Sequence, residues 1–164
     1  MPTALVIGTD HAFQRRQDLS AQNKAIRDAF EKFLQGTFAE RKTDGIAEEA
    51  GDDQAVWEYL KHLDAETPKE LRALFGATEI VDSPQPTIAR SIAEATGIHY
   101  ADIRANGAEN MSVADRDKAM AQAVDNKFAN VQSVVVIVGE AHRVEVGRIL
   151  HEKYGWTTSA VHFP

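Results

Sequence analysis

Two short segments near the ends of the chain could carry chemistry, because each combines an apolar strand, a glycine and a histidine. Residues 4–11 read ALVIGTDH, and residues 134–142 read VVVIVGEAH. In both segments the histidine, His11 or His142, comes three residues after the glycine. Imidazole changes its protonation near neutral pH, so paired histidines suit proton transfer or metal binding. The matching G-x-x-H spacing predicts a site to which both segments contribute.

Carboxylates occur at the ends of three predicted strands. Glu140 lies inside the second G-x-x-H segment, Glu48 and Glu49 end a brief apolar stretch, and Asp102 ends another. Side chains of a strand alternate between its faces, so one member of the adjacent pair faces a site directly. We expect that residue to be Glu49, which is nearer the carboxyl end. The alternatives are a surface pair at a helix entry for Glu48 and Glu49, and a solvated strand end for Asp102.

Two imidazoles with one or more carboxylates suit a divalent transition metal, which could activate water for attack on a carbonyl carbon. The candidate metal ligands are His11, Glu49, Glu140 and His142. Without a metal, the same groups suit general acid and base catalysis. Gly8 and Gly139 lie where the backbone leaves each strand, and their missing Cβ atoms allow close approach of a ligand or cofactor.

Arg116 and Asp117 are further candidates, near the beginning of a predicted helix that Ser112 caps. Asp117 shares a helical stripe with apolar residues such as Met120 and Val124. A carboxylate on an apolar stripe is out of place, so Asp117 either lies at the helix end in water or points into the site. In the site, Arg116 would stabilise an anionic intermediate and Asp117 would orient Arg116 or a histidine.

Strand and helix patterns alternate along the chain. Strands are predicted over residues 4–7, 45–50, 98–103, 133–138 and 157–163. Helices are predicted over residues 19–34, 56–63, 87–96, 112–128 and 144–154, with another beginning at a Thr67 cap. The order predicts an α/β fold, a three-layer sandwich with a mainly parallel central sheet flanked by helices. The carboxyl edge of such a sheet is where ligands bind, so the histidines and acids would gather there.

Boundaries of these elements follow from caps, turns and glycines. Gly36, Gly97 and Gly155 are predicted to stop helices. Residues 9–18 are predicted to form a loop after the first strand, and residues 77–86 a loop rather than an edge strand.

Composition and charge indicate the kind of protein, its compartment and its partners. We expect one domain over residues 1–164, because 43% hydrophobic and 26% charged residues are typical of a soluble globular chain. A formal net charge of -7 and no basic stripe argue against nucleic acid as a partner. No segment approaches the ~20 apolar residues of a membrane span or the pattern of a signal peptide, so we expect a cytoplasmic protein. The expected partner is a small-molecule or peptide substrate; monomer and homodimer both stay open.

The sequence lacks the motifs of nucleotide-binding proteins and of common serine hydrolases. The glycines fit neither G-x-G-x-x-G nor a phosphate-binding loop, and no G-x-S-x-G elbow of a serine hydrolase is present.

Taken in order, four segments resemble one superfamily: GTDH, the acidic strand end at Glu48 and Glu49, RDKAM at residues 116–120, and VVVIVGEAH. The chain is similar to the superfamily of TraB and PrgY pheromone-shutdown proteins, Tiki proteases, haem-binding ChaN and erythromycin esterases. The resemblance implies a compact α/β domain with a site built from the two G-x-x-H histidines and a glutamate. It departs from the pattern in its shorter length, its doubled glutamate and the acid Glu140.

Two functions follow from the resemblance and the residues together. The first is a hydrolase of amide or ester bonds, metal-dependent or acting on water directly, with His11, Glu49, Arg116, Asp117 and His142 as its catalytic residues. The second is a ligand-binding or regulatory module whose pocket holds haem or another small molecule.

Overall fold

Five strands form one sheet in which all neighbouring strands run parallel. The computed structural model describes residues 1–17, 21–51, 53–68, 70 and 83–164. The strands are β1 (Thr3–Thr9), β2 (Gly45–Glu48), β3 (His99–Asp102), β4 (Ser133–Gly139) and β5 (Thr157–His162). Their order across the sheet is β3-β2-β4-β1-β5. The predicted parallel sheet is confirmed, and every predicted strand is present.

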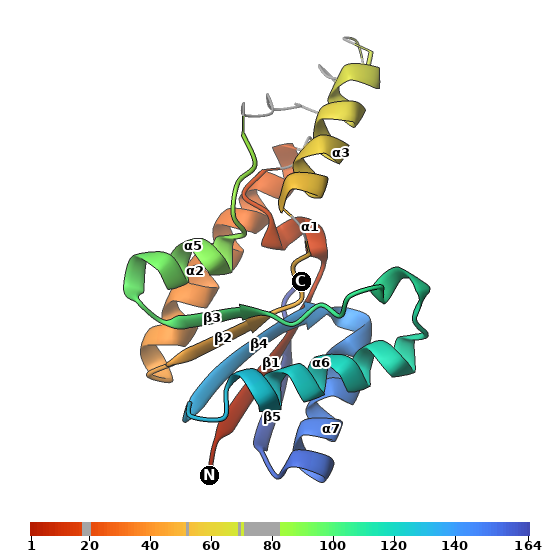
Figure 1. The fold of residues 1–164 in the computed structure, drawn as a ribbon. Coiled ribbons are helices and arrows are strands. Elements are labelled where there is room, and N and C mark those ends of the chain that lie inside the picture. Colours follow the sequence, from red (N-terminus) through yellow and green to blue (C-terminus); the bar gives the residue numbers. More distant parts are fainter. Residues whose placement is uncertain (18–20, 52, 69, 71–82) are drawn as a thin grey trace.

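Helices cover both faces of this sheet (Figure 1). The α-helices that the structure describes are α1 (His11–Gln14), α2 (Ala21–Glu40), α3 (Asp53–Glu66), α5 (Ile88–Thr96), α6 (Val113–Lys127) and α7 (Arg143–Tyr154), of which α3 extends away from the sheet. Helices α2 and α5 pack on one face, and α6 and α7 pack on the other, which confirms the three-layer sandwich. Within the described part of the chain, no helix has both the length and the apolar character needed to cross a membrane.

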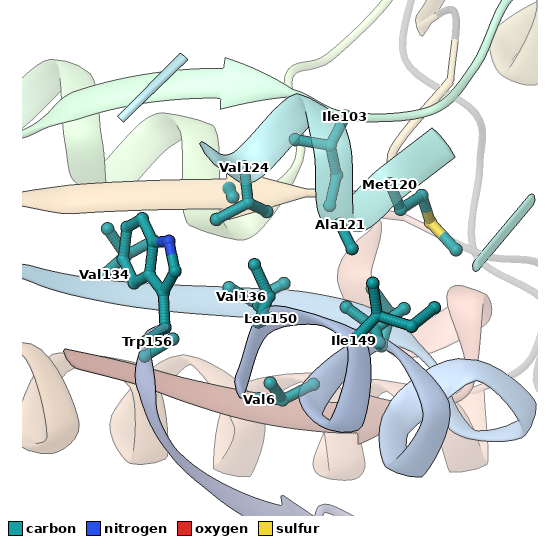
Figure 2. Close-up of a cluster of buried hydrophobic side chains, with 14 of the residues drawn as sticks. Val6, Ile103, Met120, Ala121, Val124, Val134, Val136, Ile149, Leu150 and Trp156 are labelled. Carbon is teal, nitrogen blue, oxygen red and sulfur yellow. The ribbon is translucent and has the colours of Figure 1, made fainter. Parts of the chain in front are cut away.

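Strand β4 lies between β2 and β1, and its side chains serve both cores. Val134, Val136 and Val138 pack toward α6 and α7, in the cluster shown in Figure 2. Val135 and Ile137 pack toward α2 and α5. All five are fully buried, and each such side chain contributes about 1.5–3 kcal/mol. A run of β-branched residues without polar alternation is therefore explained by burial on both faces.

Helix ends are set by local chemistry that the sequence predicts well. Ser112 caps α6, and Thr87 caps α5, each accepting a backbone N–H from the first turn. Gly97 and Gly155 follow α5 and α7 in the left-handed conformation, with φ of 74° and 76°. Both predicted stops are therefore confirmed.

The predicted stop at Gly36 is wrong, because α2 continues through it to Glu40. Phe38 lies one turn beyond Leu34 on the same helix face, and both side chains are buried in the core below α2. Burial of that aromatic ring outweighs the cost of about 0.5–1 kcal/mol for a glycine inside a helix.

The loop predicted over residues 9–18 contains a helical turn. Helix α1 begins at His11, and the Asp10 side chain caps it by accepting the Ala12 N–H at 2.9 Å. The prediction missed this turn because four residues are too few to show a helical apolar pattern. The helix predicted after Thr67, and most of the loop predicted over 77–86, fall outside the described residues.

Replacing Gly36, which lies inside a helix, and Gly97, which follows one, should have opposite effects on stability. Gly36→Ala should raise the free energy of unfolding by about 0.5–1 kcal/mol, because the position is helical and no described atom lies within 4 Å of the added Cβ. Gly97→Ala should lower it by about 1 kcal/mol, because its φ of 74° disfavours a side chain. Urea denaturation followed by circular dichroism measures both. Destabilisation by Gly36→Ala would contradict this account of α2.

Candidate active site

The carboxyl ends of three adjacent strands meet at one edge of the sheet. Thr9 of β1 pairs with Gly139 of β4, and Glu48 of β2 pairs with Ile137 of β4. The Glu49 N–H extends this pairing by donating to the Ile137 carbonyl at 2.8 Å. Helix α1 and the beginning of α3 lie beyond this edge (Figure 1). Residues distant in sequence are thus brought together by strand register alone.

Glu49 occupies the centre of this edge, between the two predicted histidines. Its carboxylate lies 3.4 Å from His11 Nε2 through Oε1 and 3.8 Å from His142 Nε2 through Oε2. The Gly139 N–H donates to Oε1 at 2.9 Å and fixes the carboxylate. The two G-x-x-H segments therefore contribute to one cluster, as their spacing predicts.

Each imidazole ring is held by its other nitrogen. His11 Nδ1 lies 2.6 Å from the Gln14 Oε1 amide oxygen, and His142 Nδ1 lies 2.5 Å from Asp117 Oδ1. Both oxygens are acceptors, so each Nδ1 carries a proton and donates it. In the neutral ring, Nε2 then presents a lone pair toward Glu49. The cluster is therefore arranged to take up, hold or pass on a proton at Nε2.

The two rings differ in exposure and in the charge behind them. The side chain of His11 is 48% exposed, whereas that of His142 is 6% exposed. Behind His142 lies the buried Asp117 carboxylate, which stabilises a positive charge on that ring. Behind His11 lies a neutral amide, which orients the ring without adding charge. Of the two places predicted for Asp117, the structure shows the one inside the site, with a histidine as its partner.

Glu48 points to the opposite face of β2 from Glu49, as strand alternation requires. It is fully buried, and its carboxylate accepts hydrogen bonds from Thr87 Oγ1 at 2.5 Å, Tyr100 OH at 2.6 Å and Gln14 Nε2 at 3.0 Å. Burial raises the pKa of Glu48, and these three hydrogen bonds oppose the rise. Glu48 thus acts on the cluster through Gln14 rather than directly.

A relay of hydrogen bonds consequently runs from Glu48 through Gln14 to His11. Gln14 Nε2 donates to the Glu48 carboxylate and, at 3.2 Å, to the Glu49 backbone carbonyl, while its Oε1 accepts from His11 Nδ1, so these two acceptors together determine which way the amide faces. The sequence prediction missed Gln14. Its position three residues after His11 is the spacing of one helical turn, but that signal has meaning only if residues 11–14 are helical.

Glu140 does not join the cluster. Its carboxylate pairs with the Arg143 guanidinium at 2.8 Å and with His162 Nδ1 at 2.9 Å. The hydrogen bond from Arg143 lowers the pKa of Glu140. The structure therefore places this predicted metal ligand in a separate ion-pair group.

The two predicted glycines make room for side chains of the chain itself. A Cβ at Gly8 would lie 2.0 Å from Glu140 Oε2 and 2.9 Å from the Arg143 side chain. A Cβ at Gly139 would lie 3.1 Å from His11 Nε2 and 3.4 Å from Glu49 Oε1. Gly139 thus allows the backbone to approach the cluster, while Gly8 accommodates the Glu140 group.

Arg116 and Asp102 lie near the cluster without a hydrogen bond to its carboxylate. Arg116 lines a cavity of about 480 Å³, the site cavity, together with His11 and Glu49. Its Nε is buried and has no hydrogen-bond partner among the described residues. Asp102 accepts the backbone N–H groups of Ala50 and Arg104 at 3.3 and 2.9 Å, so it stabilises the loops beside the cavity.

The donor set suits a divalent metal in its chemistry. Two imidazole nitrogens and a carboxylate are ligands of zinc-like ions, and the Nδ1 hydrogen bonds are the outer-shell contacts that orient such ligands. Two ligands at ~2.1 Å in tetrahedral geometry lie ~3.4 Å apart, near the distances found around Glu49. Within the described ranges, however, no group of three or more His, Asp or Glu side chains forms a ready metal site.

Comparisons with protein-family models, with curated proteins and with solved structures find no match for this chain. The resemblance to the TraB-like superfamily therefore stays a prediction.

The substitution Glu48→Gln should reverse the direction of the hydrogen bond between Gln14 and His11. The new amide oxygen would accept from Thr87 and Tyr100, which leaves its NH₂ group facing the NH₂ group of Gln14. Gln14 would then rotate, giving up the hydrogen bond from its Nε2 to the Glu49 carbonyl, and present a donor to His11 Nδ1, which moves the proton of the neutral ring to Nε2. Ring ¹⁵N chemical shifts report this tautomer, with His142 as an internal control because Asp117 holds it. An unchanged His11 tautomer would contradict the relay.

The same residue should give stability a measurable dependence on pH. Because the pKa of Glu48 is raised by burial, the folded protein binds its proton more tightly than the unfolded chain does. The free energy of unfolding should therefore be largest below the ordinary glutamate pKa and fall as pH rises through the folded value, by at most about 1.4 kcal/mol per pH unit. Urea denaturation of the wild type and Glu48→Gln over this range isolates the contribution. Parallel profiles for the two proteins would rule it out.

Proposed function

We propose that this protein is a hydrolase that cleaves an amide or ester bond with Glu49, His11 and His142. One observation carries the proposal: a buried carboxylate lies between two ring nitrogens whose opposite nitrogens are both fixed by acceptors. In such an arrangement, Glu49 can act as the base, His11 as the acid and His142 as a positive charge beside Glu49.

The proposed reaction begins with Glu49 ionised and His11 protonated. Glu49 accepts a proton from water as the water oxygen attacks the carbonyl carbon, which forms a tetrahedral oxyanion. Collapse of the oxyanion breaks the C–N or C–O bond, and His11 Nε2 donates its proton to the leaving group. The proton on Glu49 then passes to His11 and restores the starting state, so water is the only co-reactant consumed.

Burial and charge support different roles for the remaining residues. His11 is half-exposed and lines the site cavity, as an acid that meets a leaving group should. His142 lies behind Glu49 with Asp117, where its positive charge would hold the carboxylate in place. Arg116, with a buried Nε lacking a partner in the described part of the chain, would stabilise the oxyanion.

A divalent metal is the alternative way to activate the water. His11, His142 and Glu49 would hold it, and it would supply Lewis-acid polarisation and a more acidic water. Elemental analysis of the purified protein, with activity measured before and after chelation, separates the metal-dependent hydrolase from the direct one.

Substitutions at the cluster test the proposal on 4-nitrophenyl esters and peptide 4-nitroanilides. Glu49→Gln, His11→Ala and His142→Asn should each lower the rate about 10²- to 10⁴-fold. His142→Asn is chosen because its amide can still donate to the buried Asp117, whereas alanine would leave that carboxylate without a partner and destabilise the fold. Thermal melting should show His11→Ala close to the wild type, since that side chain is half-exposed.

His62→Ala is the matched control, because this histidine is exposed on α3 and pairs with Glu66. It should retain full activity. Equal rates for wild type and the cluster variants would overturn the hydrolase. An absorption band on haem titration, without cleavage of any substrate, would instead favour the ligand-binding module.

A further inference from the structure

The site cavity carries more positive charge than the rest of this acidic protein suggests. Four arginines line it, Arg15, Arg16, Arg104 and Arg116, against two carboxylates, those of Glu49 and Asp53. The chain as a whole has a formal net charge of -7. A local excess of cations beside a candidate reaction centre attracts a ligand of opposite charge.

Two of these arginines already have acidic partners. Arg16 donates to Glu31 at 3.0 Å, and Arg104 lies 3.7 Å from Glu109. Both carboxylates that line the cavity are engaged as well, since Asp53 binds Arg90 and Glu49 lies within the histidine cluster. Their charges are therefore compensated inside the protein.

Arg15 and Arg116 differ from the other pair. Among the residues that the structure describes, neither has an acidic partner, and the Arg116 Nε is buried without any acceptor. A guanidinium group that lines a cavity and has no acidic partner there can bind an anionic group supplied by a ligand. Arg15 directly follows α1, and Arg116 lies in the first turn of α6.

Helix α3 adds an apolar and aromatic part to the lining of the cavity. Helix α3 contributes Val56, Trp57, Tyr59 and Leu60 to the lining. Flat rings and aliphatic side chains beside guanidinium groups suit a ligand with an apolar or aromatic body and one anionic end.

We propose that the site cavity binds substrates with an oxyanion group, a carboxylate or a phosphate, held by Arg116 and Arg15 while an apolar portion packs against α3. The inference deepens the proposed function and rests on it, because it names the substrate class of the same site. In this assignment Arg116 binds the anionic group of the substrate instead of the tetrahedral intermediate, and the bond to be cleaved would extend from that group toward Glu49 and His11.

Titration with simple probes tests this without any turnover. Benzoate and phenyl phosphate carry the two oxyanions, and benzamide is the neutral counterpart of benzoate. Binding would be followed by ¹H–¹⁵N spectra of the backbone and of the arginine Nε–H groups. Benzoate or phenyl phosphate should bind at least tenfold more tightly than benzamide and shift the Arg116 Nε–H resonance, and the tighter of the two identifies the oxyanion.

Substitutions locate the anion. Arg116→Gln should weaken binding of the oxyanion about 10- to 100-fold, the ordinary effect of removing a charged hydrogen bond. Arg116→Lys should restore part of it, and Arg15→Gln provides a second variant at a more accessible position. Arg148→Gln is the control, because that residue lies on α7 and pairs with Glu145 and Glu152. It should change nothing.

The outcomes separate this inference from the hydrolase proposal. Affinities for both benzoate and phenyl phosphate that do not exceed the affinity for benzamide, or unchanged binding in both Arg116→Gln and Arg15→Gln, would overturn the oxyanion site. Oxyanion binding that depends on Arg116, without cleavage of any ester or amide, would retain the site and reject the hydrolase. Cleavage of neutral and anionic esters at equal rates would retain the hydrolase and reject the substrate class.

Discussion

A carboxylate buried at the edge of a parallel sheet must be compensated, and the site is built around this requirement at Glu49. Only 5% of the residue is exposed, so water cannot supply the hydrogen bonds that its two oxygens need. The Gly139 N–H donates to one oxygen, and the His11 and His142 rings, one at each oxygen, compensate the negative charge when their Nε2 atoms carry a proton. These contacts come from β4 and α1, so the acid holds its place only when three strand ends are correctly aligned.

The same requirement explains why each histidine has a partner behind it. An imidazole that faces a carboxylate must keep its other nitrogen occupied, or the ring could turn and leave the acid uncompensated. Asp117 does this from α6 and Gln14 does it from α1. Because one partner is charged and the other neutral, two rings of the same type acquire different chemical characters.

Prediction from sequence succeeded where a structural feature is determined by residues close together in the chain. The run of valines in β4 predicts burial on both faces of the sheet. Ser112 begins α6 and Gly97 ends α5 through contacts within a few residues. The approach of His11 and His142 to one carboxylate also follows from sequence, because adjacent parallel strands end at the same edge, where Thr9 pairs with Gly139 and the two G-x-x-H segments lie one residue out of register.

Prediction failed where the deciding contact is remote or depends on another missed element. Gly36 stays helical because Phe38 is buried, and Glu140 turns away because Arg143 and His162 offer it better partners. Gln14 could not be assigned before its helical turn was known.

The position of β1 between β4 and β5 has a consequence for biosynthesis. Of the strands that the structure describes, β1 is synthesised before the other four, yet it hydrogen-bonds only with β4 and β5, so it must stay unpaired until β4 has been made. Both halves of the histidine cluster would then assemble in one late step, and a nascent chain that stops before β4 would have no site.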